Sequence, residues 1–208
     1  EIKECDWSSD VCSSDLETFS GFRLAFGGAQ ELLGIMPDMT IYGRAVGGGL
    51  PLGALAGRAE VMKVFSRHRR PGNDPTFSGN AMSVAGGVAT LSALHTARAS
   101  IYPRLNEAGR GLADTFNAFC AEVNLPVHMR AVGSMLRIVF GGAETVPAHV
   151  ETAFYLFALS RSVFVHASRS IFLSAAHRAA DLGYVVRALM ESLRDVRDDG
   201  LFAVSPKD

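Results

Sequence analysis

The sequence predicts an α/β protein in two parts, a layer of alternating strands and helices followed by a smaller α+β domain. From Glu17 to about Thr96, short apolar runs alternate with helical patterns, as in layers built on a parallel sheet. From residue 99 onward, short strands alternate with longer helices and no repeat is visible. Hydrophobic residues make up 48% of the 208 residues, ample for a core, and no apolar run approaches the ~20 residues of a membrane span.

A glycine-rich turn between two expected strands dominates the first part. The apolar run Met39–Tyr42 suits a buried strand, which delivers Gly43 and Arg44 to its own end. Gly47–Gly49 permits backbone conformations closed to other residues, and Leu52–Ala56 returns as a second apolar strand. Three glycines alone are also typical of an ordinary turn between buried strands.

Two helices are expected around this turn. Gly27–Gly34 predicts a short helix that ends at a glycine. Asn80 suits the cap of a second helix, in which small and apolar residues recur at three- and four-residue steps. We expect this stripe to pack in the core: Ala81, Val84, Ala85, Val88, Leu91 and Leu94.

In the second part, Pro103 is expected to open a long amphipathic helix. One side of this helix, predicted to be buried, carries Leu105, Leu112, Phe116 and Phe119. The remaining pattern predicts strands near 127–132, 135–140, 163–165 and 171–174, and helices near 148–160 and 179–196.

The first sixteen residues differ from the rest of the chain. They show no apolar periodicity, and Trp7 to Leu16 is the translation of TGG AGT TCA GAC GTG TGC TCT TCC GAT CTx, part of a common sequencing adapter. We interpret residues 1–16 as a non-native segment; the alternative is a natural Ser/Asp-rich tail. Removing its one basic and five acidic residues from totals of 20 and 21 leaves 19 and 16, a nearly neutral chain.

Near-neutral charge gives no argument for nucleic-acid or membrane-surface binding. The only basic cluster, Arg67–Arg70, lies in a Pro/Gly/Asn stretch without aromatics and favours a solvated loop over an anion site. Outside the first sixteen residues Cys120 is the single cysteine, so no disulfide framework is available, and a reducing cytoplasm is expected. The six histidines show no metal-ligand spacing, and no metal is expected.

Several motifs together carry a family resemblance. PDMTIYGRAVGGGLPLGALAGR, residues 37–58, resembles the active-site segment of class III aminotransferases, fold-type I pyridoxal-phosphate enzymes, and looks closest to the glutamate-1-semialdehyde aminomutase group. Arg44 stands where that family carries its Schiff-base lysine. The resemblance extends over ETFSGFR, GGAQELLG, TFSGN, GSMLRIVF and FLSAAH, which begin at residues 17, 27, 76, 133 and 172.

The resemblance implies a fold, a cofactor and a set of partners. Residues 17–98 would form part of the large domain that binds pyridoxal 5'-phosphate, and 99–208 the smaller C-terminal domain. Gly43 would lie in the cofactor site, and Thr76 would reach the cofactor phosphate of a neighbouring subunit; Thr76 could instead simply begin a helix. Leu16 occupies the position of the aspartate that pairs with the pyridine nitrogen. A cytoplasmic homodimer with shared sites and a small-molecule amino substrate is therefore expected, with no nucleic acid or membrane partner.

Arg44 bears directly on activity. A Schiff-base lysine must shed its proton to act as nucleophile and base, whereas a guanidinium stays protonated in proteins. We therefore expect the chain to be inactive as a transaminase. One base transition converts a lysine codon to an arginine codon, so Arg44 is either a sequence error or the mark of a silent cofactor- or partner-binding pseudoenzyme. A nucleotide-binding domain is disfavoured because neither G-x-G-x-x-G nor G-x-x-x-x-G-K-[ST] is present.

Overall fold

Two structural units make up the chain. The computed structural model describes residues 14–67, 78–141, 146–166 and 170–202. Contacts divide it into Glu1–Ser100 and Ile101–Asp208. Within the described ranges, no helix has the length and apolarity that a membrane crossing requires.

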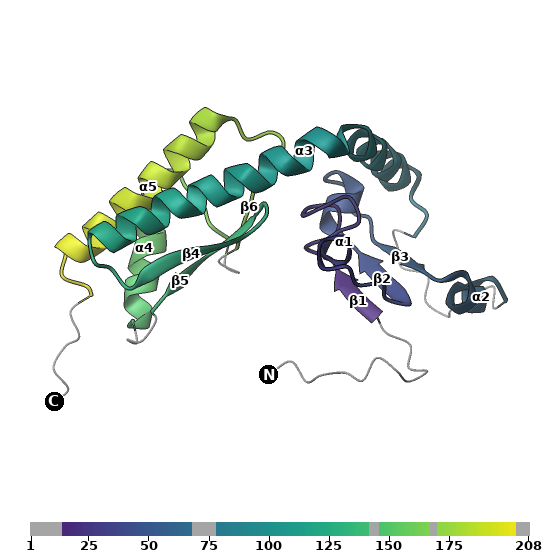
Figure 1. The fold of residues 1–208 in the computed structure, drawn as a ribbon, viewed down its shortest axis with the longest axis horizontal. Helices are drawn as coiled ribbons and strands as arrows, with labels where there is room; N and C mark the ends of the chain where they lie inside the picture. Colours follow the sequence, from purple (N-terminus) through teal and green to yellow (C-terminus); the bar gives the residue numbers. More distant parts are fainter. Residues whose placement is uncertain (1–13, 68–77, 142–145, 167–169, 203–208) are drawn as a thin grey trace. The chain divides into compact units, whose positions relative to one another are not determined.

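A three-stranded mixed sheet organises the first unit (Figure 1). Strand β1, Ser14–Glu17, runs parallel to β2, Met39–Tyr42, and β2 runs antiparallel to β3, Ala54–Gly57. The expected parallel sheet is therefore wrong for β3, because the connection after β2 is shorter than the dozen or more residues that a crossover needs. Helix α2, Ala59–Arg67, was not predicted and follows β3 directly.

One face of this sheet is packed against α1, Ala29–Leu33, which ends at Gly34 in the left-handed conformation, as predicted. The Gln30 side chain accepts a hydrogen bond from Thr40 Oγ1 (3.1 Å) and donates to the Tyr42 hydroxyl. The opposite face carries an aligned row of exposed apolar side chains, one from each strand: Leu16, Ile41 and Leu55.

Helix α3 is continuous from Ala81 to Glu122. The predicted helix start at Pro103 is wrong, because Pro103 lies inside α3. An interior proline removes the hydrogen bond to the carbonyl four residues earlier. That residue, Ala99, is exposed.

The stripe expected in the core at the start of α3 is mostly exposed, and the prediction is wrong there. Val84 and Val88 are 44% and 61% exposed, while Ser83 is buried at 2%. The helix instead turns Gly86 and Gly87 toward the residues that follow β2. Asn80 caps α3 as expected, since its Oδ1 accepts a hydrogen bond from the Ser83 amide (3.0 Å).

The second unit contains an antiparallel sheet in the order β4–β5–β6. Strands β4, Val127–Val132, and β5, Met135–Phe140, have the predicted bounds, and β6 spans Ser170–Phe172. The strand predicted at 163–165 is wrong. The Val163 amide instead donates to the Ala158 carbonyl (2.9 Å) and so completes the end of a helix.

Helices α4, Ala148–Ser160, and α5, Ala179–Asp198, complete the core of this unit together with the C-terminal part of α3. The predicted apolar side of α3 is confirmed as core. Its four residues are at most 8% exposed, and facing side chains are fully buried: Phe154, Leu189 and Leu193. Cys120 lies in the same core, where burial raises the pKa of its thiol to about 12, so the thiol stays protonated at neutral pH.

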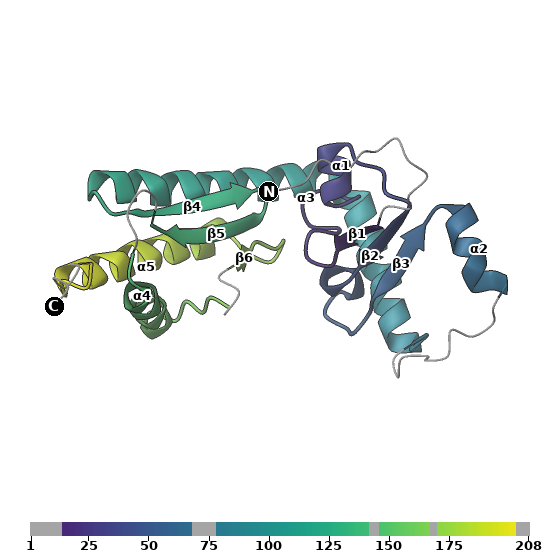
Figure 2. The same ribbon diagram turned by 90° about the horizontal axis from the view of Figure 1, so that it is seen from below.

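Strand β4 is an edge strand that runs beside α3 (Figure 2). The Asn117 side chain, on α3, donates to the Met129 carbonyl (2.9 Å) and accepts from the Met129 amide (2.6 Å). One side-chain amide thus satisfies both outward-facing backbone groups of a strand residue.

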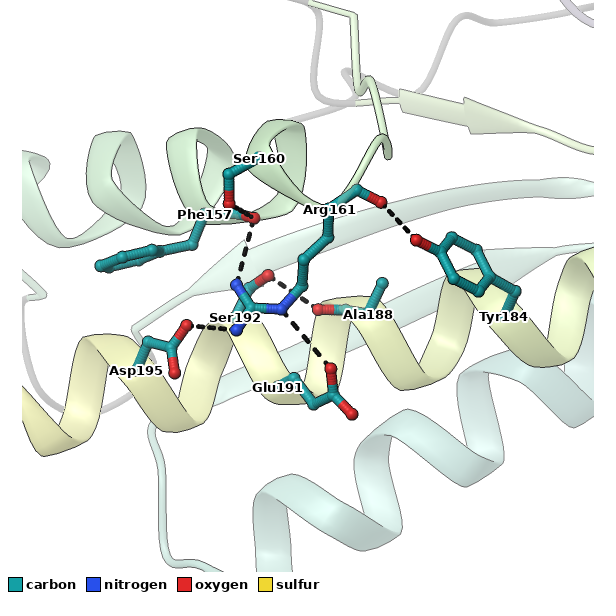
Figure 3. A network of polar contacts seen from close by, with 8 residues as sticks. All are labelled: Phe157, Ser160, Arg161, Tyr184, Ala188, Glu191, Ser192 and Asp195. Carbon is teal, nitrogen blue, oxygen red and sulfur yellow. Dashed lines mark hydrogen bonds and ion pairs between the residues drawn. The ribbon is translucent and has the colours of Figure 1, made fainter.

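Arg161, just after α4, ties that helix to α5 (Figure 3). Its guanidinium pairs with Asp195 and, at 3.5 Å, with Glu191, and it donates to the Phe157 carbonyl (3.3 Å). Its backbone carbonyl accepts a hydrogen bond from the Tyr184 hydroxyl (2.7 Å). The side chain therefore joins the Phe157 carbonyl in the last turn of α4, which also accepts from the Ser160 hydroxyl, to carboxylates on α5.

Two glycines of α3 provide a matched test of the packing in this unit. A Cβ on Gly109 would lie 2.1 Å from the Gly133 carbonyl oxygen, whereas a Cβ on Gly111 would meet nothing within 4 Å. We expect Gly109→Ala to lower the free energy of unfolding by about 2 kcal/mol through overpacking. We expect Gly111→Ala to raise it by roughly 0.5–1 kcal/mol through helix propensity. Urea unfolding followed by circular dichroism measures both, and equal effects would contradict the close packing.

Candidate functional site

The candidate site lies where the chain leaves β1 and β2. Because these strands are parallel, their carboxyl ends meet at one edge of the sheet, where sites of open α/β sheets are found. A Cβ built on Gly43 would lie 3.7 Å from Cβ of Thr18, in ordinary contact. The two strand-end loops therefore lie close together at Gly43 and Thr18.

Arg44 opens a 3₁₀ turn, η1, Arg44–Gly47, directly after Gly43. Its φ of 47° is in the left-handed region, which is uncommon for a residue other than glycine. Its guanidinium carbon lies 3.9 Å from the centroid of the Phe19 ring, a cation–π contact. Phe19 lies in the loop after β1, so Arg44 reaches from one strand-end loop to the other.

The glycine-rich turn is pressed against α3. A Cβ on Gly86 would lie 3.2 Å from the Gly47 carbonyl oxygen, and one on Gly87 would lie 3.3 Å from that of Val46. Gly48, which ends η1 with φ 61°, leaves no room either, because its Cβ would lie 2.1 Å from Thr90 Oγ1. The turn and α3 are thus closely packed at these glycines, and an added Cβ would also press on the side chains of Leu50 (2.6 Å from a Cβ on Gly86) and Leu52 (2.5 Å from a Cβ on Gly87).

A carboxylate is buried behind the loop that follows β1. Glu17 is 0% exposed, and its carboxylate accepts hydrogen bonds from the Ser20 hydroxyl and from the backbone amide of Gln30 (2.7 Å). The Gln30 bond caps the first turn of α1 in place of a local capping side chain. Gly28, with φ 83°, has no space for a Cβ because the same carboxylate would lie 2.7 Å away.

Positive charge accumulates beside Phe19. Arg23 Nε donates to the Phe19 carbonyl oxygen (3.0 Å). Burial, and after it the charge of Arg44, lowers the pKa of Arg23. Within the part of the chain that the structure describes, no carboxylate pairs with Arg44.

The predicted site residues have different outcomes. Gly43 and Arg44 lie together at the end of β2, as the strand pattern predicts, whereas Thr76 and most of the basic cluster Arg67–Arg70 fall outside the described residues. Leu16 lies in β1 and pairs with Ile41. Across the described ranges, no group of three or more His, Cys, Asp or Glu side chains is placed to hold a metal ion.

Sequence reasoning missed three residues of this region: Glu17, Phe19 and Arg23. The three-residue spacing of Glu17 and Ser20 was a signal, because a carboxylate and a hydroxyl at that spacing meet across one turn. Nothing in the sequence shows that Phe19 lies under Arg44, since their loops come from different strands.

Comparison with known proteins gives a consistent family signal. The model of the family described as Aminotransferase class-III matches residues 24–186. A glutamate-1-semialdehyde 2,1-aminomutase of Sulfurihydrogenibium sp. is 37% identical over 176 residues, which are 80% of this chain and 41% of that protein. One from Methanosarcina acetivorans is 34% identical over 202 residues, 93% of this chain and 47% of that protein. The chain thus spans less than half the length of these relatives.

Solved structures agree. An omega-transaminase from Sphaerobacter thermophilus superposes with a TM-score of 0.79 at 26% identity, over 88% of this chain and 44% of its own. A β-phenylalanine aminotransferase from Variovorax paradoxus gives a TM-score of 0.75 at 27% identity, over 90% of this chain and 44% of its own. A transaminase with PLP bound gives a TM-score of 0.78 at 25% identity, over 90% of this chain and 45% of its own.

Neighbouring glycines test the contact between the turn and α3. Gly48 and Gly49 both have positive φ, 61° and 101°, but a Cβ on Gly49 would meet nothing within 4 Å. We expect Gly49→Ala to cost about 1 kcal/mol of unfolding free energy through backbone strain, and Gly48→Ala roughly 2–3 kcal/mol through strain and the Thr90 clash. Hydrogen exchange of the amides of residues 46–52 and urea unfolding measure the difference. Identical losses would show that α3 does not press on this turn.

Proposed function

This chain belongs to the class III aminotransferase family, and from that premise we propose that it is part of a pyridoxal-phosphate-dependent aminotransferase or aminomutase. The family has the fold-type I architecture and uses pyridoxal 5'-phosphate. The proposed reaction class is amino-group transfer on an amino acid or amino-aldehyde of the glutamate-1-semialdehyde type, after the names of the relatives. Residues 17–98 would belong to the large domain and 99–208 to the small domain.

The observation that carries the proposal is Arg44 at the end of β2, between Gly43 and the glycine turn. We assign Arg44 to the position of the Schiff-base lysine, and we assign Gly43 to a contact with the coenzyme. We assign Thr76 to a contact with the phosphate of the coenzyme bound in a neighbouring subunit, which requires a homodimer with shared sites. A cytoplasmic location is part of the same proposal.

The residues present do not fit a covalently held coenzyme. Pyridoxal phosphate supplies an aldehyde and an electron-withdrawing ring, and its use requires an amine that loses its proton. The guanidinium of Arg44 stays protonated, so it neither forms the imine bond nor moves a substrate proton. Leu16, an apolar side chain, stands where the pyridine nitrogen would need a carboxylate. Loss of the proton shuttle alone reduces rate about 10²- to 10⁴-fold, and we propose that the chain is inactive in amino transfer.

A second candidate function is a pseudoenzyme of the same fold that binds the coenzyme or a partner chain without chemistry. The cation–π contact favours it, because Arg44 is held over Phe19 rather than directed at a proton acceptor. Under this alternative the arginine is an inherited feature, and restoring a lysine returns no activity.

Borohydride trapping tests the proposal. The full chain is mixed with pyridoxal phosphate, reduced with borohydride and mapped by peptide mass spectrometry. We expect no adduct at Arg44 in the chain as it stands and a reducible adduct at that position in Arg44→Lys, with a visible absorption band before reduction. If no adduct forms at position 44 of the Arg44→Lys variant, the assignment of this strand end to the coenzyme is contradicted.

Two controls sharpen the result. Arg58→Lys places an amine on the same hairpin but away from the strand end, at a side chain paired with Asp38 (3.1 Å). Lys63 reports non-specific labelling in every sample. Equal adduct formation at the lysines introduced by Arg58→Lys and Arg44→Lys would mean that labelling depends only on the exposure of the lysine.

A further inference from the structure

Two arginines lie directly opposite each other on one face of the sheet in the second unit. Strands β4 and β5 run antiparallel (Figure 2), and their register pairs Arg130 with Arg137, both of which are exposed. Residues paired in this way have Cβ atoms about 4.5–5.5 Å apart, so the two side chains start as immediate neighbours. Arg130 Nε also donates a hydrogen bond to Nε2 of His128, two residues earlier on the same face (3.3 Å). Basic side chains are therefore concentrated on this part of the sheet.

The sheet has no acidic side chain to balance these arginines. Strands β4, β5 and β6 read VHMRAV, MLRIVF and SIF, without an aspartate or a glutamate. Among the residues that the structure describes, no ion pair includes Arg130 or Arg137. Like charges placed directly opposite each other destabilise a sheet. Carboxylates brought by a partner would add an attraction where the sheet alone has a repulsion.

An apolar row lies beside the arginines on the same face. Val132, Met135 and Phe172 are paired across the three strands. Val132 is 55% exposed, and the other two side chains are half-buried. The core of the unit lies on the opposite face, where the alternate residues of β4 and β5 are at most 4% exposed: Val127, Met129, Leu136 and Ile138. The outward face therefore presents a basic row next to an apolar row.

We propose that this face, with Arg130 and Arg137 in the basic row and Val132 and Met135 in the apolar row, is a docking surface for an acidic segment of a partner polypeptide. The guanidinium fork matches the two oxygens of a carboxylate. The two rows are two residues apart along β4 and along β5. An extended partner segment that carries an acidic and an apolar residue at the same spacing would contact both rows with one of its sides.

Charge complementarity favours an acidic polypeptide over a nucleic acid. A nucleic-acid site typically contacts many phosphates, about 6–10 in strong binders, whereas this face offers two arginines and one histidine. The apolar row suits the side chains of a polypeptide better than a sugar–phosphate backbone. The docking surface goes beyond the proposed function and does not rest on it, because it lies in the second unit and involves no coenzyme.

Peptide binding to the full chain tests the docking surface. The probe is a fluorescein-labelled peptide of three Glu-Thr-Val-Thr repeats, which places Glu and Val alternately on one side when the peptide is extended. The control peptide has Gln at every Glu position. We expect a saturable rise in fluorescence anisotropy with the acidic peptide and about tenfold weaker binding of the control. Equal binding of the two peptides overturns the proposal.

Substitutions locate the binding. Arg130→Gln and Arg137→Gln are each expected to weaken binding of the acidic peptide about two- to fivefold, and together about tenfold or more. Arg104→Gln removes the same charge from an exposed position on α3 and should bind as the parent chain does. An equal loss in Arg104→Gln would mean that only net charge matters, and this overturns the docking surface.

A charge reversal separates binding from folding. Arg137→Glu places a carboxylate opposite Arg130, so we expect a higher urea midpoint together with loss of peptide binding. Circular dichroism monitors the unfolding. A lower midpoint would contradict the cross-strand contact between the two arginines, and retained peptide binding would contradict the docking surface.

Two further measurements identify a different occupant. A thymidine decanucleotide that binds as tightly as the acidic peptide, with the same sensitivity to Arg130→Gln and Arg137→Gln, would assign the face to a nucleic acid and overturn the choice of a polypeptide. Sedimentation velocity of the chain alone reports self-association. A dimer that Arg137→Glu dissociates would assign the face to a second copy of the chain, which likewise overturns the acidic partner.

Discussion

The contact between the glycine turn and α3 fixes the strand end at which the candidate site lies. Residues 46–48 and Gly86–Gly87 are packed so closely that a Cβ added to Gly48, Gly86 or Gly87 would lie within 2.1–2.6 Å of a neighbouring side chain. This contact holds η1 in place, and η1 begins at Arg44. The direction in which β2 delivers its last residues is therefore set by a helix that begins more than thirty residues later. The place of residue 44 therefore depends on glycines elsewhere in the chain.

The change of one side chain at that location alters the class of interaction available. A lysine amine on this backbone could exchange its proton and form a bond to carbon, whereas a guanidinium offers only charge and fixed donors. The neighbourhood has features consistent with charge: Phe19 supports the cation, and Arg23 adds a second one. The buried Glu17 keeps its role in shaping the loop and capping α1, independently of any ligand. The hydrogen bonds that shape this loop, made by Glu17, therefore do not depend on which side chain stands at position 44.

Local signals in the sequence were sufficient for much of the fold. Strands β2, β4 and β5 have the bounds that their apolar runs predict, and the Asn80 cap and the Gly34 stop follow from side-chain and backbone preferences that act within a few residues. Pro103 misled the prediction because the helix continues through it and packs at residues on both sides, from Gly86 to Phe119. The stripe at Val84 and Val88 misled it because periodicity identifies an apolar face and not its partner. The pairing of Arg44 with Phe19 is a contact between loops, which no local pattern encodes.

The Asn117 bridge has a consequence for how the protein behaves at high concentration. An exposed edge strand has unpaired backbone N–H and C=O groups, which can pair with an extended segment of another chain. At Met129 both groups are already occupied by an amide that belongs to the same chain. A foreign segment must displace this amide before it can extend the ladder, so fibril-like growth from the β4 side meets an intramolecular competitor.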